Sequence, residues 1–531
     1  MTRSAASVGM SRWRSLAASV STALLLFFAM PGYFGWWPLL FLALVPLLSV
    51  ALYLPPRRSG CMGFMAGFLY HILTLHWIVV VLGRYGGLPP WLSVSAMVLL
   101  AAYMGMYCAL FCFLFSLLAG RSWHRERSVA VLVWTAPILW VGLDYLRGFL
   151  FTGFPWLDLG YGLYSQPVLI QAADLGGHHL LSFTLVLANG FIVAVFDRQR
   201  PQVRWNIRRE KRALLLACCF LIFVFGYSMV RFRVMPSLFR HSLQAEISVV
   251  QGNIAQNLKW SPQQKEQTIE TYERLSRQAV TDHTTELLVW PETALPFYPQ
   301  QDPLAARVVG LAEKENLYLL TGAPTFAIKG EGRQRQVSYF NSALLIDPNG
   351  RIVGIHAKQH LVPFGEYVPL RKLLPFLSPL VENIGDFTAG ISSSPLVVGK
   401  QLRLGILICF ESIFPKVARD EVAAGANLLV NLTNDAWYGR TSAPYQSMAM
   451  AVLRAVENKR SLVRAANTGI SGFVDPVGEV VQQTKIFTPA AITAKVPAFE
   501  KQTVFVRGGY AFGGLCLAGI PMLLIWRKRQ L

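Results

Sequence analysis

The sequence predicts a bundle of eight membrane-spanning helices joined to one layered α/β domain. Of the 531 residues, 53% are hydrophobic and only 15% are charged, whereas soluble chains usually carry about 25% charged residues. The hydrophobic residues gather in long runs near both ends of the chain. Between them, residues 236–507 contain no run of the roughly 20 apolar residues that a membrane span requires.

Eight apolar runs are candidate spans, at 16–30, 34–54, 61–82, 91–118, 128–147, 180–196, 213–230 and 508–526. The first and sixth are short. The first resembles a signal peptide because Arg12 and Arg14 precede it, but no small-residue cleavage site follows, so we expect a retained anchor. Three regions are therefore predicted. They are 1–235 with seven spans, 236–507 outside the bilayer, and 508–531 with the eighth span and a tail.

The distribution of charge predicts the orientation of these spans. Residues 1–235 hold 19 Lys and Arg against 6 Asp and Glu, whereas residues 236–507 hold 27 against 23. In the first region the basic residues lie mainly in alternate loops, and such loops remain cytoplasmic. We therefore expect both termini inside the cell and 236–507 outside it. A nucleic-acid partner would require a basic face on the soluble domain, and the near balance of charge there argues against one.

Strand and helix signals alternate along 236–507. Expected strands lie at 245–253, 286–292, 317–324, 339–358 (two strands around a Pro-Asn-Gly turn), 403–411, 427–435, 462–469 and 472–480. Expected helices lie at 261–279, 303–316, 415–424 and 443–459. This alternation predicts a layered α/β domain, and the hairpins predict mixed rather than purely parallel sheets.

The segment 361–390 lacks periodicity but is rich in Pro, Phe, Leu and Gly, which makes it apolar for a loop. It is either a packed surface loop or a mobile lid that touches lipid. Large exposed apolar patches tend to mark interaction sites, which favours the lid.

Cys409 is the one cysteine outside the apolar runs. A compartment outside the cytoplasm is oxidising and favours paired cysteines, so an unpaired thiol there is either an inert core residue or a reactive group. Two other polar residues, Glu292 and Lys358, also follow apolar strands, and the ends of strands meet at a sheet edge where sites form. A carboxylate can activate the thiol, and a lysine can stabilise an oxyanion. The three residues together predict an acyl-transfer site.

These three residue types resemble the nitrilase superfamily, whose sites use Glu, Lys and Cys. A wider set of ordered motifs, together with the eight runs, resembles the apolipoprotein N-acyltransferases over nearly the whole chain. The motifs are GFPW (153–156), QGNIAQNLKW (251–260), WPETALP (290–296), KQHLVPFGEYVPL (358–370), NLTNDAWYG (431–439) and RAVENKRSLVRAANTGISG (454–472).

The resemblance implies a nitrilase-like α-β-β-α sandwich domain on an eight-helix base in a bacterial inner membrane, with the catalytic domain periplasmic. It also implies a ping-pong acyl transfer without a cofactor or metal. The donor is a membrane phospholipid, typically phosphatidylethanolamine, and the acceptor is the α-amine of the S-diacylglyceryl cysteine of a diacylated apolipoprotein. On this reading Glu292 is the general base, Lys358 stabilises the oxyanion, and Cys409 is the nucleophile.

Three further residues match positions that are important in the family, and two more are expected near the site. Glu366 matches a carboxylate that positions the site, while Glu411 and Trp260 match other important residues. Trp437 is expected to line the site. Phe410 departs from the pattern, because the family usually has Tyr directly after the cysteine, so a role for that hydroxyl is not expected here.

Two other hypotheses fit parts of the sequence. A membrane-tethered amidase or nitrile hydrolase would use the same triad but let water resolve the acyl-enzyme, although a tether needs only one span. A transporter or scaffold would place ionisable residues inside the spans, where His71, His76 and Asp144 are too few to outline a pathway. His356 and His360 lie four apart beside a strand and lack an evident third ligand, so no metal site is predicted.

Overall fold

The computed structural model places the chain in two compact units. The residues it describes are 11–119, 129–198, 207–256, 261–281, 284–330, 335–363, 365–367, 387–391 and 394–529. One unit comprises Met1–Val79, Pro90–Val230 and Tyr510–Leu531, and the other comprises Val80–Pro89 and Arg231–Gly509. The short segment Val80–Pro89 thus leaves the first unit and belongs to the second.

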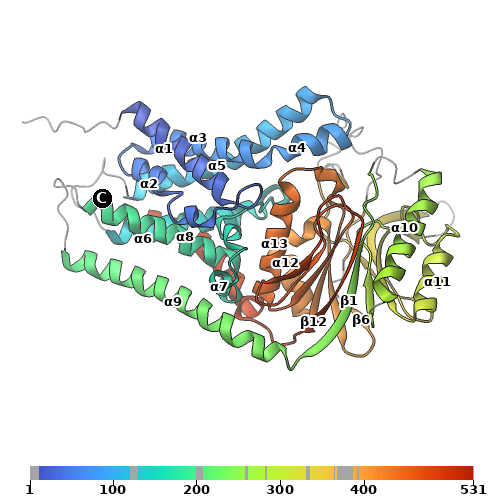
Figure 1. Cartoon of the computed structure of the whole chain (residues 1–531). Helices are drawn as coiled ribbons and strands as arrows, with labels where there is room; N and C mark the ends of the chain where they lie inside the picture. The colour runs from blue at the N-terminus through green and yellow to red at the C-terminus, as the bar shows by residue number, and fades with distance from the viewer. Residues whose placement is uncertain are drawn as a thin grey trace, which may run out of the picture. The chain divides into compact units, whose positions relative to one another are not determined.

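The first unit is helical (Figure 1). Its longer elements are α1 (Arg12–Ala29), α3 (Pro56–Leu75), α5 (Pro90–Ala119), α6 (Val129–Arg147), α8 (Ala173–Arg198), α9 (Ile207–Phe239), whose last residues belong to the second unit, and α14 (Ala511–Lys528). Its shorter elements are η1 (Trp37–Phe41), α2 (Val45–Ala51), α4 (Trp77–Val79), η3 (Leu150–Thr152), η4 (Leu159–Leu163) and α7 (Pro167–Ile170).

Small residues allow α3 and α5 to pack closely. A Cβ atom added to Gly63 would lie 2.4 Å from the carbonyl oxygen of Cys108, and one added to Gly67 would lie 2.7 Å from Cβ of Cys108. Helices inside membranes commonly approach through small residues, because lipid provides no hydrophobic drive to bring them together. The close contact between α3 and α5 therefore depends on the absence of a Cβ atom at Gly63 and Gly67.

Four helices among the described residues are long and apolar enough to cross a membrane, namely Pro90–Ala119, Ala173–Phe196, Lys211–Phe239 and Phe505–Lys528. A fifth is added if Pro56–Leu75 and Trp77–Tyr85, which meet at a bend of 49°, form one span. The other expected runs form α1, α6 and the pair η1 and α2. The structure therefore supports several apolar helices in this half of the chain, and the count of eight spans stays a prediction.

Most of the ionisable side chains buried in the first unit form ion pairs or hydrogen bonds with one another. Arg147 lies 3.2 Å from Asp144 and also forms an ion pair with Asp158, whose second oxygen lies 2.8 Å from Nε2 of His178. His71 places Nδ1 2.7 Å from the carbonyl oxygen of Gly67 in its own helix. This pairing gives the cluster a structural role in holding the loop after α6 to the start of α8.

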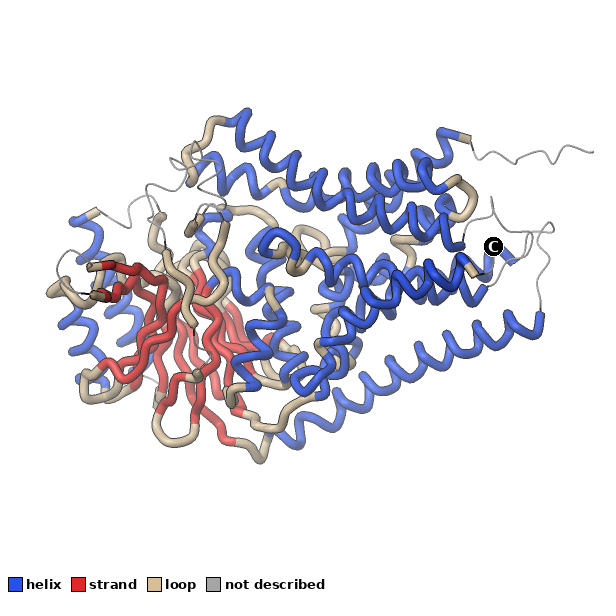
Figure 2. Tube along the Cα trace, turned by 180° about the vertical axis from the view of Figure 1, so that it is seen from behind, coloured by secondary structure: helices blue, strands red, loops and turns tan. Residues whose placement is uncertain are grey.

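The second unit contains two six-stranded mixed sheets, as expected from the hairpins (Figure 2). In order across the first sheet, the strands are β12 (Ala490–Ala498), β1 (Leu243–Gln251), β2 (Leu287–Val289), β3 (Tyr318–Lys329), β4 (Gln336–Ile346) and β5 (Ile352–Ala357). Across the second sheet they are β11 (Val480–Gln483), β10 (Gly472–Val474), β9 (Ser461–Ala466), β8 (Leu428–Thr433), β7 (Leu402–Ile408) and β6 (Leu396–Val398). Parallel pairing joins β1 to β2 to β3 and β7 to β8 to β9.

Helices cover the outer faces of the two sheets, which completes the α-β-β-α order that the resemblance implies (Figure 1). The helices α10 (Pro262–Thr281) and α11 (Ala305–Glu315) pack on the first sheet, and α12 (Pro415–Ala423) and α13 (Ala443–Asn458) on the second. Neighbouring residues of β2 show that each strand is covered on both faces. Leu287 and Val289 enter the core between the sheets, while Leu288 joins the core under the helices. Strands covered on both faces read as continuous apolar runs, which is why they could be located from the sequence.

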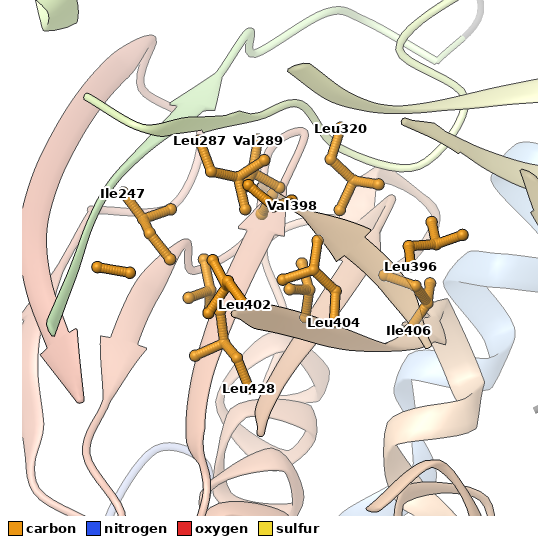
Figure 3. Packing of buried hydrophobic residues seen from close by; sticks show 14 of the residues in the cluster. Ile247, Leu287, Val289, Leu320, Leu396, Val398, Leu402, Leu404, Ile406 and Leu428 are labelled. Carbon is orange, nitrogen blue, oxygen red and sulfur yellow. The ribbon is translucent and has the colours of Figure 1, made fainter. Parts of the chain in front are cut away.

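The core between the sheets consists of aliphatic side chains from both (Figure 3). Leu287, Val289 and Leu320 of the first sheet face Leu404 and Val398 of the second. Dense packing of this kind tolerates little loss of volume. The strand β7 that carries Cys409 at its end is therefore held firmly on both faces.

Shortening Ile406, a fully buried residue of β7, tests the importance of this core. We expect Ile406→Ala to lower the stability of the unit by about 2–5 kcal/mol, because it leaves a cavity. The matched control is Ile355→Ala, at a side chain 55% exposed on the edge strand β5, which should change stability by less than about 0.5 kcal/mol. Thermal unfolding of the purified protein measures both. Equal effects of the two substitutions would contradict the assigned core.

Candidate active site

Three strand ends bring the predicted triad together. Glu292 lies three residues beyond β2, Lys358 directly follows β5, and Cys409 directly follows β7. Glu292 and Lys358 are buried, Lys358 almost completely at 1% exposed, and Cys409 is half-buried. The charges of Glu292 and Lys358 both act on the Cys409 thiol. The residues that the sequence suggested by position at strand ends therefore share one buried site.

The backbone at Cys409 adopts an unusual conformation. Its φ angle is +55°, in the left-handed region, which costs a residue other than glycine on the order of 1–3 kcal/mol. The turn continues into the short helix η7 (Cys409–Ile413). Strain at a functional position persists only where the surroundings enforce it, and here a buried carboxylate does so.

Glu411 is that carboxylate. Its Oε2 accepts a hydrogen bond from the backbone N–H of Ile408 at 2.7 Å, and its Oε1 accepts from the N–H groups of Gln359 and His360 at 2.7 and 2.9 Å. One side chain thus ties the turn that carries the nucleophile to the loop that begins at Lys358. Burial raises the pKa of Glu411 to about 7, against the opposing effects of Lys358 and the three N–H groups.

Lys358 is paired with Glu366, eight residues later. Its Nζ lies 2.9 Å from Oε1 and 2.8 Å from Oε2 of that carboxylate, and Oε2 also accepts from the N–H of Val362 at 2.8 Å. Burial alone would lower the pKa of Lys358, but the negative charges of Glu366 and Glu292 outweigh it and raise the pKa overall. The lysine is therefore a fixed positive charge at neutral pH, as an oxyanion stabiliser must be.

The thiol of Cys409 is protonated when the site is at rest. Burial raises its pKa, and the negative charge of Glu292 raises it further, while Lys358 acts in the opposite direction without cancelling them. Since the thiolate is the reactive form, attack requires a base at the moment of reaction. An adjacent carboxylate supplies this activation without leaving a permanent charge on sulfur.

Three of the expected supporting residues are Phe410, Trp437 and Trp260, and the structure describes the first two. Phe410 is buried and packs edge-on against Phe414, with ring centres 5.5 Å apart. Trp437 is half-buried and meets the ring of Tyr85 edge-on at 5.9 Å, in the segment Val80–Pro89. Trp260 lies outside the described residues. The roles of all three therefore remain predictions.

The ends of the segment 361–390 are anchored beside the site. Phe387 N–H donates to the carbonyl of Glu366 at 3.0 Å, and Gly390 N–H donates to that of Lys358 at 2.7 Å. A Cβ atom on Gly390 would lie 2.3 Å from the carbonyl oxygen of Ala357, so only glycine fits there. Residues 364 and 368–386 lie outside the described part of the chain, so the expected lid remains untested.

Two functional candidates were missed at the sequence level. Asn341, in the middle of β4, donates from Nδ2 to Oε1 of Glu292 at 2.8 Å and to Oε1 of Glu366 at 3.0 Å. Tyr438 lies close enough to Cys409 for the two groups to interact electrostatically; burial first, and then that thiol, raise the pKa of the phenol. A mid-strand Asn carries no sequence signal that separates it from ordinary structural residues, whereas Tyr438 lies in the motif NLTNDAWYG and could have been found there.

Among the described residues, the side chains that could jointly hold a metal ion are not at this site. They are Asp158, His178 and His179 of the first unit, whose donor atoms lie within 4.8 Å of one another. Asp158 already binds Arg147 and His178 through its two oxygens.

The buried carboxyl of Glu421 in α12 predicts a pH dependence of stability. Burial first, and then the nearby Glu411, raise its pKa from 4.5 to about 8, while Gln359 donates to its Oε1 at 3.0 Å. A group whose folded pKa is raised stabilises the fold below its unfolded value and loses that contribution as pH rises through its folded value. The Tm should therefore fall as pH rises from about 4.5 to about 8, and Glu421→Gln should flatten this decline.

Scanning fluorimetry over this pH range measures the effect. Glu270→Gln, at an exposed position of α10, is the matched control and should keep the wild-type slope. Parallel curves for wild type and Glu421→Gln would contradict the assignment.

Comparison with known proteins shows the family to which the chain belongs. Residues 22–191 match the family model for the apolipoprotein N-acyltransferase N-terminal domain, and residues 246–502 match that for carbon-nitrogen hydrolase. An apolipoprotein N-acyltransferase from Geobacter metallireducens is 41% identical, covering 93% of this chain and 92% of that one. Another from Vibrio cholerae is 30% identical, covering 94% of each. A solved carbon-nitrogen hydrolase from Helicobacter pylori G27 is 18% identical, covering 49% of this chain and 90% of that one, with a TM-score of 0.35. The identities over nearly the full length show that the chain belongs to the apolipoprotein N-acyltransferase family.

Proposed function

We propose that this protein acylates the α-amine of the S-diacylglyceryl cysteine at the N-terminus of apolipoproteins, giving triacylated lipoprotein. The acyl donor is a membrane phospholipid, with phosphatidylethanolamine as the expected class, and the chain passes through a thioester on Cys409. The observation that carries the proposal is the grouping of the buried Glu292 and Lys358 with the half-buried Cys409 at three strand ends. The family of the full chain supports the choice of substrates.

In the first step Glu292 takes the thiol proton of Cys409, and the sulfur attacks the carbonyl carbon of the phospholipid ester. Lys358 stabilises the negative charge that develops on the carbonyl oxygen. The ester C–O bond then breaks, and Glu292 returns the proton to the departing oxygen. The products of this step are a lysophospholipid and a thioester on Cys409.

In the second step the uncharged amine of the acceptor attacks the thioester carbon. Glu292 accepts a proton from the nitrogen, the C–S bond breaks, and that proton returns to the sulfur of Cys409. An amide forms and the free thiol is regenerated. The same base and the same oxyanion stabiliser therefore serve both steps.

The proposed setting is a bacterial inner membrane. The spans in 1–235 and 508–531 number eight in this proposal, both termini are cytoplasmic, and 236–507 lies on the periplasmic side. The basic residues of alternate loops support this orientation. A membrane location suits the reaction, because both substrates carry acyl chains that would otherwise be exposed to water.

A membrane-bound amidase or nitrile hydrolase is the second candidate, favoured by the carbon-nitrogen hydrolase match over 246–502. The two functions differ in what resolves the acyl-enzyme. Incubating the acylated protein with a diacylglyceryl-cysteine peptide distinguishes them, since an acyltransferase yields triacylated peptide and a hydrolase yields free fatty acid.

The first prediction of this proposal concerns the thioester. Intact-protein mass spectrometry after incubation with phosphatidylethanolamine should show an adduct of one acyl chain on wild type. Cys409→Ala should show none, because the sulfur that carries the chain is absent. Cys61→Ala, at an exposed cysteine of α3, is the matched control and should still be acylated. Acyltransferase activity that survives Cys409→Ala would contradict the proposal.

The second prediction concerns the oxyanion stabiliser. Lys358→Ala should slow acyl-enzyme formation by roughly 10²–10³-fold, since losing one such group costs about 2.7–4 kcal/mol. Lys400→Ala, at an exposed turn between β6 and β7, should leave the rate unchanged. Rates are compared for variants whose Tm shows that they are folded. A near-normal rate for Lys358→Ala would exclude this role.

A further inference from the structure

Asn341 contacts three charged residues of the site, namely Glu292, Glu366 and Lys358. Its side-chain Nδ2 donates to Glu292 at 2.8 Å and to Glu366 at 3.0 Å, and its backbone carbonyl accepts from the N–H of Lys358 at 2.8 Å. The residue is only 7% exposed and belongs to β4, a strand paired on both sides. A side chain mounted on an interior strand holds its partners more precisely than one on a loop.

The orientation of this amide is determined by its partners. Both carboxylates accept hydrogen bonds, so the group between them must be the NH₂. The reverse orientation would set the amide oxygen against two negative oxygens. In the observed orientation, Oδ1 of Asn341 has no partner among the described atoms, which shows that the hydrogen bonds to the two carboxylates determine how the amide lies.

The amide of Asn341 joins the two carboxylates of the site. Oε1 of Glu366 accepts from Lys358 and Asn341, and Oε2 accepts from Lys358 and the N–H of Val362. Oε1 of Glu292 accepts from the same NH₂ group of Asn341. One amide group thus orients both carboxylates relative to each other.

We propose that Asn341 is a positioning residue that fixes the plane of Glu292 and separates it from Glu366, so that Glu292 serves as the base in both steps. This inference rests on the function proposed above. Two buried carboxylates that approached each other without a donor between them would repel and favour protonation of one of them. The amide prevents this, because it gives each carboxylate one N–H.

Two variants separate positioning from charge. Asn341→Ala removes both donors and adds no charge, so acyl-enzyme formation should slow by about 100-fold, the loss typical of a misplaced reacting group. Asn341→Asp keeps the shape but adds a third negative charge. The rate should fall at least as far, and the pH giving half of the maximal rate should move upward, because a neighbouring negative charge opposes ionisation of the base and the thiol.

The measurement is the single-turnover rate of Cys409 acylation against pH, by intact mass, with Tm recorded for each variant. Asn427→Ala is the matched control. This Asn is equally buried and makes two hydrogen bonds of 2.8 Å with Arg403 and Gln401, away from the triad. It should lower Tm and leave the rate and the pH profile unchanged. Asn341→Ser replaces Asn341→Ala if the latter does not fold, with the same expectation.

Glu292→Gln, measured in parallel, distinguishes failure of this inference from failure of the proposed function. If Glu292→Gln abolishes acylation while the Asn341 variants keep the wild-type rate and pH profile, the positioning role is wrong and the proposed function stands. If the Asn341 variants lower Tm only, with rate and profile as in Asn427→Ala, the role is structural and the inference is overturned. If Glu292→Gln is fully active, the proposed function itself fails.

Discussion

The site depends on the burial of one positive charge. Lys358 is almost fully removed from water, and an unpaired ammonium there would cost several kcal/mol. Glu366 supplies the opposite charge, Asn341 satisfies that carboxylate further, and Glu411 ties the loop that starts at Lys358 to the turn of Cys409. Cys409 and Glu292, the proposed nucleophile and base, thus lie around a positive charge that is already compensated in the resting protein.

For the proposed function, this arrangement explains how the thiol of Cys409 can be unreactive at rest and reactive with substrate. Burial raises the pKa of Cys409, so the thiol stays protonated until a base acts on it. A carbonyl group held near Lys358 changes the balance, because negative charge can then move from Glu292 through sulfur to an oxygen that the lysine stabilises. The strained φ of Cys409 and the packed core under β7 keep the sulfur in one place while this happens.

The sequence was sufficient to predict the layered α/β domain, because strands covered on both faces read as apolar runs and end in polar residues such as Glu292 and Cys409. It could not predict Asn341 as part of the site, since an Asn within a strand has many ordinary uses and its two partners come from loops distant in the chain. The predicted run 61–82 also extended past the bend after Leu75 and included the start of Val80–Pro89, a segment that belongs to the second unit. The bend between Pro56–Leu75 and Trp77–Tyr85 depends on packing, and the average hydropathy of a segment contains no information about packing.

The central claim is that the acyl chain rests on Cys409 between two substrates. A pulse-chase experiment tests it most directly: wild-type protein is loaded from a phospholipid with an isotope-labelled chain, freed of donor, and mixed with a diacylglyceryl-cysteine peptide. The account predicts that label leaves Cys409 at the same rate as labelled triacylated peptide appears, with one chain transferred per chain lost. Product that forms while the label stays on Cys409, or label lost only as fatty acid, would contradict it.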